Sequence, residues 1–177
     1  MTEKFDYFSA ALTIIYALYC TVIRLFHLYT TPQKSSNDKT TFKTTLSVFF
    51  ISLYLMHVAY LSLLPRFDYT YNMAFNVALG LVHNLLWLLY ALPSSISVLH
   101  RFSSRPRSYR PRFVNKPVYL VTVTILATGL ELFDFSPWLR VIDAHALWHL
   151  ATAPIAVYWY RFLLDDASDP SWRDHKL

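Results

Sequence analysis

Five long apolar segments run through this chain of 177 residues, and they constrain its fold more than any other feature. They cover residues 6–29, 42–64, 71–92, 117–135 and 138–164, with polar or basic stretches between them. At 1.5 Å per residue, each is about long enough to cross the ~30 Å hydrocarbon layer of a membrane as a helix. The sequence therefore predicts an all-α fold, a polytopic membrane bundle of about five transmembrane helices that forms a single domain over residues 1–177.

The composition agrees with a membrane protein, since 55% of the residues are hydrophobic and only 15% are charged. An ordinary soluble domain has about 45–50% apolar and about 25% charged residues, and could not cover so much apolar surface. The single cysteine, Cys20, excludes an internal disulfide and a cysteine-rich zinc site. Residues 6–29 are too long for the apolar part of a signal peptide and lack its cleavage site, so we interpret them as a membrane span.

The basic residues fall unevenly on the two sides that five alternating helices would create. Ten of the 16 lie in residues 30–41, in the loop 94–116 and in the tail after residue 165, which share one side, and Arg24, Lys43 and Arg161 lie near the same side. By the positive-inside rule this side is cytosolic. The other side, luminal or extracellular, collects the acidic residues Glu3, Asp6, Asp68, Glu131, Asp134 and Asp143. The net charge of +5 is therefore explained by membrane orientation and does not require a nucleic-acid partner.

Residues 100–113 of the basic loop alternate arginine with aromatic residues and prolines. In isolation such a segment could bind RNA or anionic lipids. The favoured alternative is a cytosolic loop that is basic only because it orients the bundle, since no RNA-binding fold surrounds it.

Candidate chemistry lies at the start of the last apolar segment, in the sequence DAHALWH. His145 and His149 are four residues apart, so on a helix both imidazoles project from one face. Two neutral imidazoles placed in this way can bind one metal ion, and zinc suits such ligands. A catalytic zinc usually takes three protein ligands and a water, so a third ligand must come from elsewhere. The spacing alone leaves a metal site and a structural helix contact equally open.

The predicted topology places four carboxylates near the depth of the histidine pair. They belong to Asp6, Asp68, Glu131 and Asp134. One of them could orient a ligand histidine or accept a proton from a metal-bound water. The lone histidines of the spans, His57 and His83 beside Asn84, are expected to form hydrogen bonds between helices. Asn72 and Asn76 share one helix face, so they could form a close helix contact or touch a lipid headgroup.

Four stretches of the sequence resemble the PER-like family of GPI-anchor remodelling factors, within the CREST superfamily of membrane hydrolases. They are TEKFDYF, HVAYLSLLPRFDYTYNMAFNVALGLV, LELFDFSPWLRVIDAHALWH and FLLDD, and in order they span nearly the whole chain. The resemblance implies a seven-helix protein of the endoplasmic reticulum or Golgi membrane. Its implied activity is that of a phospholipase A2, which removes the unsaturated sn-2 acyl chain from the lipid of GPI-anchored proteins.

The same resemblance implies a zinc site. The superfamily holds zinc among three histidines, with a serine and an aspartate nearby, and His145 and His149 match the histidine pair while Asp6 matches the catalytic aspartate. The family's serine and third histidine precede the TEKFDYF stretch, where this chain has only Met1. We therefore expect the chain to correspond to helices three to seven of a longer protein, as a truncated gene model, a short isoform or a degenerate copy. Such a form would bind zinc weakly and hydrolyse little lipid on its own.

Two other function classes stay open. The chain could be a non-catalytic component that associates with lipid-processing partners, or a receptor-like CREST relative. Transport through the polar residues has less support, because no span is broken by paired Gly and Pro at mid-depth. The sequence motifs of serine hydrolases, nucleotide-binding loops and zincins do not occur.

Overall fold

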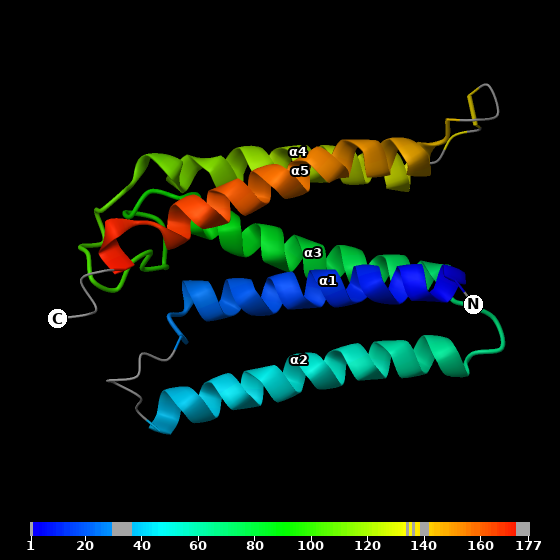
Figure 1. Cartoon of the computed structure of the whole chain (residues 1–177), viewed down its shortest axis with the longest axis horizontal. Coiled ribbons are helices and arrows are strands. Elements are labelled where there is room, and N and C mark those ends of the chain that lie inside the picture. The colour runs from blue at the N-terminus through cyan, green and yellow to red at the C-terminus, as the bar shows by residue number, and fades with distance from the viewer. Residues whose placement is uncertain (1, 30–36, 134, 136, 139–141, 173–177) are drawn as a thin grey trace. The chain divides into compact units, whose positions relative to one another are not determined.

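The computed structural model describes residues 2–29, 37–133, 135, 137–138 and 142–172. In these ranges the chain forms five α-helices and one short 3-10 helix (Figure 1). The helices are α1 (Thr2–Leu25), α2 (Asn37–Leu63), α3 (Tyr69–Ala91), α4 (Lys116–Leu132) and α5 (Ala144–Ala167), and the 3-10 helix η1 (Arg112–Asn115) leads into α4. The predicted all-α membrane bundle is confirmed in its class.

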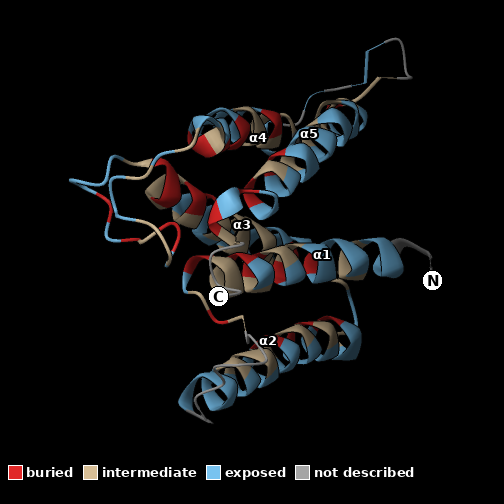
Figure 2. Cartoon of the chain, turned by 60° about the vertical axis from the view of Figure 1, so that its left-hand side comes forward, coloured by how far each residue is buried: buried red, intermediate tan, exposed pale blue. Residues whose placement is uncertain are grey.

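Four stretches of these helices are long and apolar enough to cross a membrane. They are Lys4–Leu25, Asp38–Leu63, Tyr69–Ala91 and Arg112–Leu130. The fifth helix, α5, has 24 residues but is not among them. Many large apolar side chains are exposed, as in Leu63 on α2, which suits surfaces that face lipid. Exposed residues dominate the visible sides of α2 and α5 in Figure 2.

Local caps shift several helix ends from the predicted positions. α1 ends at Leu25 and not at residue 29, because His27 takes a left-handed backbone conformation with φ 54°. The Leu28 amide then donates to the Ile23 carbonyl at 3.0 Å, a bond typical of a helix C-terminus. α5 begins at Ala144 and not at residue 138, because Asp143 is its N-cap; before it, Trp138 and Ile142 form an antiparallel backbone pair.

The chain divides into two compact units, Met1–Leu86 and Trp87–Leu177, and the division falls within α3. In the first unit, Ile15 and Leu18 of α1 pack against Phe50 of α2. The Tyr19 hydroxyl also forms a 2.9 Å hydrogen bond with Ser47 Oγ. In the second unit, α4 and α5 lie side by side along much of their length (Figure 1).

Candidate metal centre

The histidine pair lies in the first turns of α5, and Asp143 determines where this helix begins. Asp143 has an extended backbone, and its side chain accepts a 2.7 Å hydrogen bond from the Ala146 amide. This is an N-cap, which fixes the first turn two residues before His145. Sequence reasoning counted Asp143 only among the luminal acids, although an aspartate directly before a helical pattern is itself an N-cap signal.

The two imidazoles lie together. His145 Nε2 and His149 Nε2 are 3.0 Å apart, and the ring centroids are separated by 4.5 Å. Two nitrogens bound to one tetrahedral zinc lie roughly 3.3 Å apart, given Zn–N bonds of about 2.0–2.1 Å. Both histidines are exposed. The pair therefore fits two positions of a zinc site, and the metal itself stays a prediction.

Trp148 contacts both histidines and was missed as a site residue at the sequence level. Its ring centroid lies 4.6 Å from that of His149 and 5.6 Å from that of His145. A large rigid ring in this position limits the rotamers that the imidazoles can take. Its spacing of three residues from His145 was the available signal.

The carboxylates of the predicted cluster have different positions and roles. Asp68 is the N-cap of α3, since its Oδ1 accepts from the Tyr71 amide at 2.9 Å, which gives it a structural role. Asp6 is an exposed residue of α1 in the first unit, and its function beside the histidines stays a prediction. Asp134 and the side chain of Glu131 lie outside the described residues. Within the described part of the chain, no three His, Cys, Asp or Glu side chains gather as a metal site requires.

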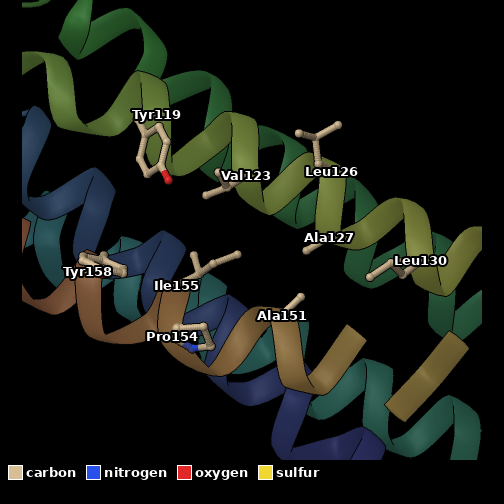
Figure 3. A pocket seen from close by; sticks show the side chains of 9 residues that line it. All are labelled: Tyr119, Val123, Leu126, Ala127, Leu130, Ala151, Pro154, Ile155 and Tyr158. Atoms are coloured by element: carbon tan, nitrogen blue, oxygen red, sulfur yellow. The ribbon is translucent and has the colours of Figure 1, made fainter. Parts of the chain in front are cut away.

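An apolar groove of about 450 Å³ lies between α4 and α5. Figure 3 shows side chains of both helices around it. The lining residues are Tyr119, Val123, Leu126, Ala127, Leu130, Ala151, Pro154, Ile155 and Tyr158. At 100° per residue, the lining face of α5 is nearly opposite the face that carries His145 and His149. The groove therefore does not open onto the imidazoles.

The polar residues of α3 form local pairs. Asn76 Nδ2 donates to Asn72 Oδ1 at 3.3 Å, so these two side chains share a helix face as predicted. His83 Nδ1 lies 3.5 Å from Asn84 Oδ1. His57 of α2 is buried and stacks on Phe75 with ring centroids 4.0 Å apart.

The basic loop folds over the C-terminal end of α3, where helix carbonyls lack intrahelical partners. Arg101 Nε donates to the Tyr90 carbonyl at 2.8 Å, and Arg110 donates to the Ala91 carbonyl at 2.7 Å. Arg101 is only 4% exposed, and both this burial and the nearby Arg110 lower the pKa of its guanidinium. The positive charges are also attracted by the negative end of the helix dipole, which lies at the C-terminus. The loop arginines thus have a structural role that orientation alone does not explain.

The last turn of α5 and the segment after it complete this structure, which we call the arginine cap (residues 97–115 and 165–172). The Tyr90 hydroxyl donates to the buried carboxylate of Asp166 at 2.8 Å. The Tyr109 hydroxyl donates to Asp169 Oδ2 at 3.1 Å. Ser104 Oγ donates to the Ser171 carbonyl at 2.6 Å, so the loop and the C-terminal segment are joined at several points.

The chain is similar to known proteins over nearly its whole length. The model of the Per1-like family matches residues 1–167. The chain is 42% identical to the Protein PER1 homolog of Schizosaccharomyces pombe, over 95% of this chain and 45% of the relative. It is 39% identical to the GPI-specific phospholipase A2-like PGAP3 of Cricetulus griseus and 36% identical to that of Homo sapiens, in each case over 94% of this chain and 45% of the relative.

The chain thus spans about half the length of the curated relatives that it matches. No solved structure matches it. The family model nonetheless covers both units and includes the histidine pair, and so the chain belongs to the Per1-like family.

Proposed function

We propose that this chain acts in GPI-anchor lipid remodelling, in a zinc-dependent hydrolysis that removes the unsaturated sn-2 acyl chain from GPI-anchored proteins. The main support is the 3.0 Å approach of the two Nε2 atoms of His145 and His149. The similarity to relatives named GPI-specific phospholipase A2-like proteins gives the substrate class. Because the chain spans 45% of those relatives, the complete activity is proposed for the whole protein.

The residues of this chain have defined parts in the proposed reaction. His145 and His149 would hold the zinc, which when bound polarises the ester carbonyl and lowers the pKa of a water. Asp143 and Trp148 keep the two imidazoles in position, through the N-cap and the ring contacts described above. Asp6 is proposed to accept a proton from the attacking water.

The proposed setting is the membrane of the endoplasmic reticulum or Golgi. The loop 94–116 would face the cytosol and the start of α5 the lumen, in accord with the distribution of basic residues. The lipid part of GPI-anchored proteins and the surrounding membrane lipids are the proposed partners.

Zinc binding by the purified chain tests this proposal. Because only two of the expected ligands belong to this chain, we expect weak binding that approaches one zinc per chain at saturating zinc in native mass spectrometry, and a loss of bound zinc in His145→Ala and in His149→Ala. His27→Asn is a matched control, because it removes a histidine at the end of α1 and asparagine tolerates a left-handed backbone. Zinc binding that survives both α5 substitutions would contradict the proposed site.

A second candidate function is a non-catalytic membrane component or a receptor-like relative. Mass spectrometry of GPI lipids from cells that express the whole protein separates the two functions. If the protein is a hydrolase, the GPI lipids lose their sn-2 acyl chains, and this loss requires His145. If it is a non-catalytic component, the lipid composition stays unchanged.

A further inference from the structure

His57 of α2 carries two ring nitrogens that lack a hydrogen-bond partner. The residue is 1% exposed, and neither Nδ1 nor Nε2 is bonded within the described structure. Its ring lies parallel to that of Phe75, with an interplanar angle of 14°. The ring of Tyr71 stacks nearby at 5.5 Å between centroids. The aromatic contacts satisfy the faces of the imidazole and leave its polar edge unpaired.

A second unpaired atom lies in the same part of the first unit. Asn72 is beside the imidazole, and it accepts the hydrogen bond from Asn76. Asn76 Oδ1 is buried and has no partner of its own. His57 is six residues before the end of α2, and Asn76 is seven residues after the start of α3, so both lie about 10 Å from the α2–α3 turn. We call His57, Asn72 and Asn76 the polar triad.

Unpaired polar atoms are costly inside a membrane, because no bulk water is present to bond them. Ionisable side chains within a span therefore usually mark a site with a polar partner. α2 and α3 both qualify as membrane spans, so the polar triad is in such a position.

The donors and acceptors of the polar triad indicate the chemistry of its partner. A neutral imidazole offers one N–H donor and one acceptor, and Asn76 Oδ1 adds another acceptor. A carboxylate, which only accepts, would be repelled by Asn76 Oδ1, and so would a phosphate. Metal coordination is poorly supported, since no group of three His, Cys, Asp or Glu side chains occurs in the described ranges. A hydroxyl both donates and accepts, and therefore matches.

We propose that the polar triad is a binding site for hydroxyl groups, supplied by a buried water or by a polyhydroxylated lipid headgroup. In the described conformation the three unpaired atoms are enclosed. Tyr60 is exposed at the helix surface and its ring lies 4.5 Å from that of Tyr71, so it would border an entrance to the site. The site depends on neither zinc nor the histidines of α5.

Thermal unfolding of the purified chain in phosphatidylcholine nanodiscs tests the site. His57→Phe keeps the stacked ring but removes both nitrogens, and Asn76→Leu removes the unpaired acceptor. We expect each substitution to lower the apparent Tm. The Tm of the double variant should be no lower than that of the less stable single variant, because either substitution alone already expels the shared ligand. His83→Phe, which removes an imidazole next to Asn84, is the control and shows no such coupling to Asn76→Leu.

The lipid composition distinguishes the two sources of the hydroxyl. If the hydroxyl at the site comes from a lipid headgroup, phosphatidylinositol, whose headgroup carries several hydroxyls, raises the Tm of the wild type but not that of His57→Phe. When water is bound, the coupling persists and phosphatidylinositol has no effect. A rise in Tm on His57→Phe, or additive effects of the two substitutions, would overturn the proposal if it occurred both without and with phosphatidylinositol in the nanodiscs, because removal of unpaired atoms from a dry site is stabilising.

A second measurement keeps the proposal testable if His57→Phe fails to fold. Solid-state NMR of the 15N-histidine-labelled wild type, in lipids with deuterated acyl chains, reports protons near the His57 ring nitrogens. Transfer from water or headgroup hydroxyl protons is expected. A ring that receives magnetisation from neither source would refute the site.

Discussion

The acidic residues near the proposed site show what individual side chains contribute. Asp68 and Asp143 each begin a helix by accepting a backbone hydrogen bond, at 2.9 Å and 2.7 Å respectively. Sequence reasoning could place both on the acidic side of the membrane, because charge follows topology. It could not separate a capping carboxylate from a catalytic one, since both need an aspartate at the same side. The histidine pair was easier to predict, because its spacing of four residues already brings the rings together on any helix.

Asp143 should govern the metal affinity of the histidine pair through the helix cap. Asp143→Ala removes the cap and is expected to destabilise the start of α5 by about 1 kcal/mol, and to weaken zinc binding by the purified chain. Asp143→Asn retains a capping side chain and should restore both properties. Hydrogen exchange at the Ala146 amide, together with calorimetric zinc titration, measures the two effects. Equal loss in the alanine and asparagine variants would instead indicate a role of the negative charge.

At the scale of elements, the apolar runs predicted which segments are helical but not where each helix ends. The last run begins at residue 138, whereas α5 begins at Ala144 after the Trp138–Ile142 pair. α2 begins earlier than predicted, at Asn37, because helix formation continues through polar residues that hydropathy alone excludes. Hydropathy reports the membrane, while caps and turns determine the boundaries.

Arg101 should stabilise the C-terminal end of α3. Arg101→Met keeps the aliphatic part of the side chain but leaves the Tyr90 carbonyl without its cation and the Leu92 carbonyl with Arg110 alone. We expect a loss of roughly 1.5–3 kcal/mol of unfolding free energy, as for hydrogen bonds to a charged group. The exposed Arg112 provides the control, and Arg112→Met should change stability little. Denaturant unfolding in detergent and hydrogen exchange in the last turn of α3 measure the two effects. Equal stability of the two variants would show that Arg101 has no special role at this helix end.

At the scale of the whole molecule, the arginine cap is the part that the sequence did not predict. Its contacts join residues far apart in the chain, such as Tyr90 with Asp166 and Ser104 with Ser171. Periodicity and composition describe neighbours along the chain, so they carry no signal for such contacts. The charge asymmetry, in contrast, is a sum over many residues and indicates one orientation for the membrane bundle.

Cysteine labelling tests this orientation in sealed microsomes. In a Cys20→Ala background, Ser108→Cys in the basic loop should react with a membrane-impermeant maleimide added from the cytosolic side. Arg66→Cys, in the α2–α3 turn, should react only after the membrane is permeabilised. Labelling of both positions from the same side would disprove the alternating topology. The Cys20→Ala protein without an added cysteine, treated with the same maleimide, gives the background.

The bond between Tyr90 and Asp166 also has a consequence in time. A chain that enters the membrane during translation exposes its N-terminal helices first. Tyr90, at the end of α3, cannot form its hydrogen bond until Asp166, 76 residues further along the chain, has been made. Cap closure can occur only after α5 leaves the ribosome, so it follows the synthesis of α1 to α4. A nascent chain arrested before that point keeps an open, basic loop that a quality-control factor could recognise.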